Sequence, residues 1–158
     1  MANTQSMCTS FMGELMTATH NFGTAPIRAA TTADTFKAAL YLTSATVNAA
    51  TTAYSSTNEV TGTGYTAGGV TVTNATAPIA TNSSATAGVA YWTPSASITY
   101  TTVTLSTAFD AVLIYNSSQS NKAVSVHTFG SQTITAGTFT LTMHSNTTST
   151  ALLRLSTT

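Results

Sequence analysis

Short segments in which every second residue is apolar recur along most of this chain. In Thr35–Thr43, for example, every second residue from Phe36 to Leu42 is apolar. Because successive side chains of a strand point to opposite faces, this period of two predicts strands with one buried face. The chain is therefore expected to be an all-β protein, and its many Thr residues suit a pleated, half-solvated surface.

About seven or eight such strands are predicted, separated by turn clusters at 81–88, 116–121, 135–137 and 144–150. Many short antiparallel strands with a single helix favour a β-sandwich or jelly roll over an α/β fold. The predicted strands are Thr35–Thr43, Val70–Ala77, Gly88–Thr93, Ile98–Leu105, Phe109–Tyr115, Ala123–Phe129, Thr138–Met143 and Ala151–Leu155. The predicted core consists of Phe36, Leu40, Val72, Tyr91, Val103, Leu113, Tyr115, Val124, Val126, Phe139, Leu141, Leu153 and Leu155.

A length of 158 residues suits one domain with its own core. We expect an N-terminal helix and loop arm over residues 1–33, followed by a β-sandwich domain over residues 34–158. The helix is predicted over Thr4–Thr19, where apolar residues recur at the spacing of one helical face. Packing against the core is the commoner use of such a face, but it is also a candidate contact with a neighbouring subunit, through Met7, Phe11, Met12 and Leu15.

Charged residues make up 5% of the chain, and its formal net charge is 0. Ser and Thr account for 56 of the 158 residues, so uncharged hydroxyl groups take the place of the usual surface lysines and glutamates. A neutral surface favours association, because copies do not repel one another and hydroxyl groups lose less than charges on desolvation. We therefore expect a homo-oligomer.

Several functional classes are disfavoured by the same composition. Four scattered basic residues cannot neutralise a nucleic-acid backbone. The N-terminus lacks the pattern of a secretory signal, and no apolar run approaches the length of a membrane span. The chain is expected to be made in a cytoplasm. Its single cysteine, Cys8, has no partner for a disulfide or a zinc site, and no cofactor or metal is predicted.

The segment Glu59–Gly69 reads "EVTGTGYTAGG" and contains Gly62, Gly64, Gly68 and Gly69. A phosphate-binding glycine loop needs a strand before it and a helix after it. Here a polar, turn-like segment precedes the glycines and an alternating, strand-like segment follows them. We therefore interpret these glycines as a structural turn or bulge.

No catalytic constellation is evident. His20, His127 and His144 are far apart in the sequence, and no known nucleophile motif is present. Glu59 and Asp110 are interpreted as residues that hydrogen-bond turns rather than as a glycosidase pair. Carbohydrate could stack on Tyr91 or Trp92, but alternation places these two on opposite faces, so that one of them should lie in the core.

Five segments in order carry a family resemblance: "SFMGELMTATHNF", "ADTFKAALYLTSAT", "TTAYSSTNEVTGTGYTAGGVTVT", "AFDAVLIYNSSQSNKAVSVHTFGSQTITAGTFTLTM" and "ALLRL". Together they cover most of the chain and resemble a group of small structural proteins encoded by tailed bacteriophages and prophages. The segments "TNEVTGTGYTAGG" and "VLIYN" are the most telling. The loop "HNFGTAPIRAATTAD" is longer than in the family pattern, and the chain is unusually poor in charge.

The resemblance implies a non-enzymatic virion component that is synthesised in the cytoplasm of the bacterial host. The role it favours is a capsid decoration (cement) protein that binds the major capsid protein or other virion proteins. A small single domain, present in many copies, suits this role, and the three-fold positions of a capsid surface favour a trimer. The helical face of Met7, Phe11, Met12 and Leu15 is then a candidate capsid contact. The alternative is a neck, tail or fibre-associated virion protein, with carbohydrate binding at a host receptor as one form of it.

Overall fold

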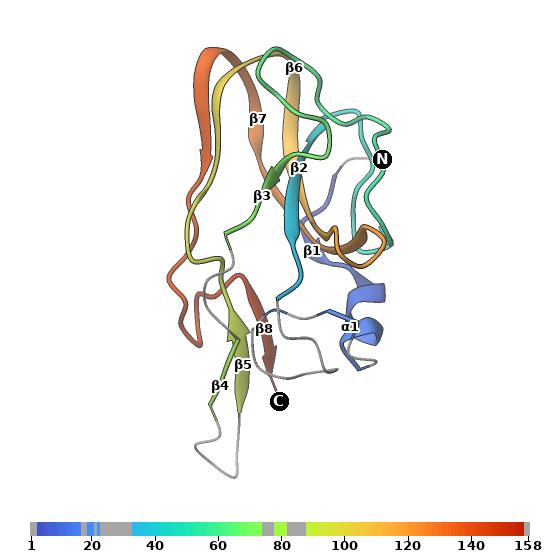
Figure 1. Cartoon of the computed structure of the whole chain (residues 1–158), viewed down its shortest axis with the longest axis vertical. Helices are drawn as coiled ribbons and strands as arrows, with labels where there is room; N and C mark the ends of the chain where they lie inside the picture. The colour runs from blue at the N-terminus through green and yellow to red at the C-terminus, as the bar shows by residue number, and fades with distance from the viewer. Residues whose placement is uncertain are drawn as a thin grey trace.

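The computed structural model describes residues 3–16, 19–20, 22, 33–73, 78–81 and 88–156. These residues form eight strands in two antiparallel sheets, together with one short helix (Figure 1). The larger sheet has the strand order β1-β7-β6-β2-β3, and the smaller has the order β4-β5-β8. The all-β prediction is thereby confirmed. The elements are β1 (Ser6–Met7), α1 (Thr9–Met16), β2 (Phe36–Leu42), β3 (Val70–Thr71), β4 (Ile79–Thr81), β5 (Val89–Trp92), β6 (Ile98–Asn116), β7 (Lys122–Leu141) and β8 (Leu153–Ser156).

The dominant feature is a long antiparallel ribbon formed by β6 and β7, which are joined by the turn at 117–121. Four short strands were predicted here, and the structure instead has two strands of 19 and 20 residues. The predicted turn at 135–137 is wrong, because these residues belong to β7. Ala136 there has a φ of 46°, and the register shifts between Ile134 and Gly137. A β-bulge bends a strand without ending it, which explains why a turn-like sequence does not make a turn.

The ribbon bends over at the top of Figure 1, so that its two halves run in different directions. Register shifts between Tyr100 and Phe109 on β6 mark this bend. Aromatic residues from the two halves meet below it: the rings of Phe109 and Phe139 lie 5.2 Å apart, edge to face. The hydroxyl of Tyr100 donates a hydrogen bond of 2.8 Å to the carbonyl of Ala38 in β2. These contacts place the core between the halves of the ribbon and β2.

β2 is buried along almost its whole length because β6 and β3 flank it. Tyr41, expected on the outer side, is 2% exposed. Two predicted core residues lie elsewhere: Tyr91 is half-buried and Leu155 is 45% exposed, since β5 and β8 form part of the small sheet. Phe139 and Leu141 are half-buried and pack against the core. The remaining predicted core residues, Phe36, Leu40, Val72, Val103, Leu113, Tyr115, Val124, Val126 and Leu153, are buried.

The N-terminal segment differs from the prediction of one helix over Thr4–Thr19, which is not seen. Ser6–Met7 is the strand β1, paired with Val126 and Ser125 of β7, and α1 has only eight residues. Pairing with β7 satisfies backbone groups that a helix would otherwise have to satisfy, and Gly13 weakens a longer helix. Of the predicted strand Val70–Ala77, residues 74–77 lie outside the described part of the chain.

Candidate functional site

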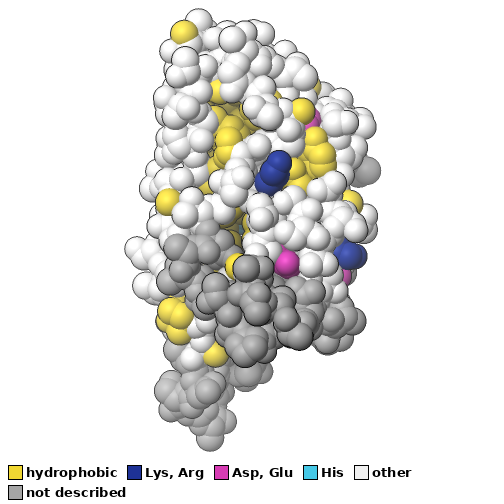
Figure 2. All heavy atoms as spheres, viewed as in Figure 1, with side chains coloured by type: hydrophobic (Ala, Val, Ile, Leu, Met, Phe, Trp, Pro, Cys, Tyr) yellow, Lys and Arg dark blue, Asp and Glu magenta, His cyan; other side chains and the backbone are white. Residues whose placement is uncertain are grey.

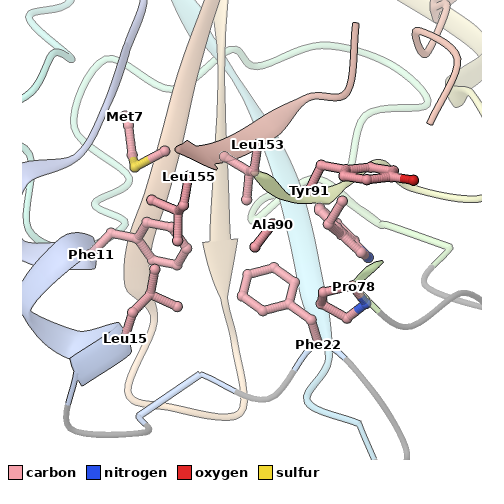
Figure 3. A pocket seen from close by; sticks show the side chains of 10 residues that line it. Met7, Phe11, Leu15, Phe22, Pro78, Ala90, Tyr91, Leu153 and Leu155 are labelled. Atoms are coloured by element: carbon pink, nitrogen blue, oxygen red, sulfur yellow. The ribbon is translucent and has the colours of Figure 1, made fainter. Parts of the chain in front are cut away.

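An apolar groove lies between the N-terminal elements and the small sheet (Figure 3). Its volume is about 90 Å³. β1 and α1 supply one wall and β5 and β8 supply the other. The residues that line it are Met7, Phe11, Leu15, Phe22, Pro78, Ala90, Tyr91, Trp92, Leu153 and Leu155.

Three residues of the predicted contact face line this apolar groove. Met7 and Leu15 are half-buried, with part of each side chain accessible. Phe11 is 1% exposed and packs edge to face on His20, with ring centroids 4.8 Å apart, so it is held within its own chain. The side chain of Met12 lies outside the described residues.

The opposite wall of the groove was not anticipated from the sequence. Trp92 is 2% exposed and meets Phe22 at 4.8 Å, so it cannot serve as an open platform for a sugar ring. Leu155, which is 45% exposed, points into the groove from β8 (Figure 3), and Tyr91 and Trp92 border it from β5. The alternation of Tyr91 and Trp92 indicated that one of them would be buried, but it could not indicate that the small sheet packs toward α1.

A buried polar network connects α1 to the turn between β6 and β7. The carboxylate of Glu14 accepts a 2.6 Å bond from Lys122 Nζ and a 2.7 Å bond from His20 Nε2. Burial pushes the pKa of Glu14 up, but the hydrogen bonds from Lys122 and His20 outweigh it, so the pKa is below its usual value. Burial lowers the pKa of His20, so this imidazole is neutral at pH 7.

The second ring nitrogen of His20 fixes its tautomer. Nδ1 lies 3.1 Å from Nδ2 of the fully buried Asn116 and accepts a hydrogen bond from it. The same amide donates to Asp34 at 2.8 Å, and its oxygen accepts the N–H of Ser118 at 3.1 Å. A neutral His20 protonated on Nε2 satisfies every one of these contacts. With its side chain 0% exposed, His20 has no access to a substrate, and the network ties the N-terminal segment to the ribbon.

The glycine-rich segment Glu59–Gly69 passes closely over two strands. Gly64, Gly68 and Gly69 have φ values of 79°, 86° and 71°, which favour glycine. A Cβ on Gly69 would lie 1.6 Å from the carbonyl oxygen of Ala38 in β2. On Gly62 it would lie 2.1 Å from the carbonyl oxygen of Thr104 in β6. In this structure the backbone of the segment thus contacts protein backbone at these glycines.

Glu59 is 5% exposed, and its carboxylate connects parts of this segment through hydrogen bonds. One carboxylate oxygen accepts the hydroxyl of Tyr65 and the N–H of Gly68, each at 2.7 Å. The other accepts the hydroxyl of Tyr54, also at 2.7 Å. Burial and the bond to Glu59 raise the pKa of Tyr54 and Tyr65. The hydroxyl of Tyr115, whose pKa burial raises to about 12, donates to the carbonyl of Gly68 at 2.8 Å.

The remaining candidate residues are dispersed. Asp110 accepts a hydrogen bond from the side chain of Asn3 at the N-terminal end. His127 lies 2.9 Å from Ser125 Oγ, and burial together with nearby His144 lowers the pKa of His127 to about 4. Ser125 is 2% exposed, and among the contacts of the described residues no carboxylate orients His127. This pair therefore lacks the geometry of a hydrolytic triad.

Cys8 is buried, and burial raises the pKa of its thiol to about 11, which disfavours the reactive thiolate. Within the described ranges, no three His, Cys, Asp or Glu side chains converge as metal ligands would. The described helix is also too short to cross a membrane.

The face of the molecule drawn in Figure 2 carries few charged side chains. Hydroxyl-bearing residues dominate the exposed part of the ribbon, where Thr99, Thr101, Ser106, Thr107, Ser131, Thr133, Thr135, Thr138 and Thr140 are all exposed. No protein-family model, curated protein or solved structure matches this chain.

Proposed function

We propose that this chain is a structural component of a bacteriophage virion, and that its role is to decorate the capsid by binding the major capsid protein. The observation that carries the proposal is the neutral, hydroxyl-rich exterior built on a β-fold with a well-formed core. Such a surface can be covered by neighbouring subunits at low cost, because few charges have to be desolvated. The segments that resemble phage structural proteins support the same role.

The apolar groove supplies part of the capsid contact in this proposal. Leu155 is 45% exposed, and Met7 and Leu15 keep part of their surface accessible beside it. Burying one large aliphatic side chain contributes roughly 1.5–3 kcal/mol. A small set of such apolar side chains is typical of the centre of a protein–protein interface.

The finer form of the fold that we propose is a β-sandwich of the jelly-roll kind. The contact between Phe109 and Phe139 brings the two halves of the β6–β7 ribbon together, as the facing layers of a sandwich would be. Tyr65 and Tyr100 stack at 5.9 Å and connect the glycine-rich segment to the same interior. These contacts support two layers made by one folded ribbon.

Copy number tests the proposal. Purified particles of the phage that encodes this chain are analysed by quantitative electrophoresis against the major capsid protein, and the protein is located in a reconstruction. Hundreds of copies over the head support decoration. Six or twelve copies at one vertex would support the alternative of a neck or tail component instead. Absence of the protein from particles would refute both.

Binding to heads that lack the protein tests the groove. Leu155→Asp places a charge in the exposed rim of the groove, and we expect it to lower occupancy of the heads at least about tenfold. Thr107→Asp is the matched control, since it adds the same charge at an exposed position on β6. Equal binding by both variants and the unaltered protein would exclude the groove from the contact.

A further inference from the structure

Among the described residues, one edge of the β6–β7 ribbon has no neighbouring strand over most of its length. The outer neighbour of β7 is β1, which pairs only with Ser125 and Val126. From His127 to Leu141, β6 is the one strand paired with β7 among the described residues. This stretch forms the upper left margin of the molecule in Figure 1. Such an edge presents backbone N–H and C=O groups that can pair with another chain.

The opposite edge of the ribbon is covered by the chain itself. β2 pairs with the part of β6 that runs from Phe109 to Asn116. Further along β6, the glycine-rich segment Glu59–Gly69 lies against this edge, where the N–H of Thr104 donates a hydrogen bond of 2.9 Å to the carbonyl of Thr63. Among the described residues, the chain thus covers the β6 edge from Thr104 to Asn116 and leaves the β7 edge beyond Val126 without a paired strand.

The residues that usually protect an accessible edge are missing. Natural edge strands carry Lys, other charged residues or Pro, or they contain bulges. From residue 123 to residue 153 the sequence has no Asp, Glu, Lys, Arg or Pro. Bulges do interrupt the pairing of β7, at Thr128–Gln132 and at Ile134–Gly137. Beyond them, the pairing of Phe139–Leu141 with Ile98–Tyr100 is regular.

We propose that the segment Gly137–Leu141 pairs, antiparallel and about a two-fold axis, with the same segment of a second copy of this chain. The occupant is a second copy because the edge is neutral and self-complementary. Two-fold pairing centred on Phe139 sets exposed Thr138 of one copy against Thr140 of the other, and Thr–Thr pairs across strands are favourable. The net charge of 0 leaves no long-range repulsion between the two copies.

This inference deepens the homo-oligomeric part of the proposed function and alters its stoichiometry. The three-fold positions of a capsid surface favoured a trimer, whereas pairing of one edge with itself closes as a dimer. The edge pairing and the capsid decoration role can be refuted independently of each other. A protein that is monomeric in solution but present in hundreds of copies on heads would refute the edge pairing and leave capsid decoration standing.

Sedimentation velocity of the purified chain tests the pairing. Five paired residues make a small interface, so we expect a reversible dimer with a dissociation constant of about 10–100 µM. The variant Thr138→Lys with Thr140→Lys puts charges on the edge and should weaken the dimer at least about tenfold, most strongly at low salt. The control, Ser106→Lys with Thr107→Lys, adds the same charges at exposed positions of β6 outside the paired segment.

Hydrogen exchange provides the second measurement. In the dimer, alternate backbone amides of Gly137–Leu141 should exchange more slowly at high than at low protein concentration. A chain that stays monomeric to about 1 mM, well above the expected dissociation constant, would overturn the proposal. So would a dimer that the edge lysines leave intact, or one that the control lysines weaken to the same extent.

Discussion

Replacing Glu59 should destabilise the fold by an amount that depends on what the new side chain can accept. The carboxylate accepts three hydrogen bonds of 2.7 Å, from Tyr54, Tyr65 and the buried N–H of Gly68. Glu59→Ala leaves two buried donors, Tyr65 and Gly68, without this acceptor, at about 1–3 kcal/mol each. Together with the lost side-chain volume, we expect about 4 kcal/mol.

Glu59→Gln should cost much less, about 1–2 kcal/mol. Its amide oxygen can take the place of the oxygen that serves Tyr65 and Gly68. Its NH₂ group then faces the hydroxyl of Tyr54, which can rotate and accept the hydrogen bond. What is lost is the charge assistance of the three bonds, because a neutral acceptor makes weaker bonds than a carboxylate.

Urea unfolding followed by tryptophan fluorescence measures both variants. Trp92, the single tryptophan, is 2% exposed and reports on the packing between the small sheet and the N-terminal segment. Thr61→Ala, at an exposed position of the same loop, serves as the control and should change stability by less than about 0.5 kcal/mol. If Glu59→Gln were as destabilising as Glu59→Ala, or if Glu59→Ala lay within about 1 kcal/mol of the unaltered protein, the reasoning would be refuted.

Three further predictions concern other contacts. Gly69→Ala should cost about 3–5 kcal/mol in chemical denaturation, from a positive φ and a clash with strand backbone, whereas Gly130→Ala, with open space around it, should be nearly neutral. Lys122→Met should lower stability at pH 7 by about 1 kcal/mol, and this difference should shrink in acid as Glu14 becomes protonated. The pKa of His127 is about 4 in the folded protein, below the ordinary value of 6.5, so its protonation opposes folding, and the free energy of unfolding should fall by about 3 kcal/mol as the pH drops from 6.5 to 4. His127→Gln should lack this part of the pH dependence.

The sequence predicted the fold class because period-two alternation depends only on which side of a strand each residue occupies. Phe36, Leu40 and Leu113 were placed in the core on that basis, and they are buried. Strand ends were harder to predict. The segment 135–137 has the composition of a turn, and only pairing with β6 shows that it is a bulge within one long strand.

The candidate contact residues show a second limit of sequence patterns. Helical spacing placed Phe11 and Leu15 on one face correctly, yet it could not indicate which neighbour would cover that face. Phe11 is buried by His20 and Phe22, while Leu15 borders the groove. The role of Glu59 depends on contacts with Tyr54 and Tyr65, and nothing in the local pattern specifies a buried carboxylate between two tyrosines.

The small number of charges in this chain has a physical explanation in the way its acids are used. Each acid, Glu14, Asp34, Glu59 and Asp110, accepts a side-chain hydrogen bond from elsewhere in the chain. Each therefore fixes a loop or the N-terminal segment, where a charge in a defined place stabilises one conformation over others. The hydroxyl-rich exterior has no such need, and a charge there would only oppose contact with a neighbouring subunit. Substitutions of the acids should accordingly impair folding first, whereas charges added to the exposed threonines should impair assembly and leave folding intact.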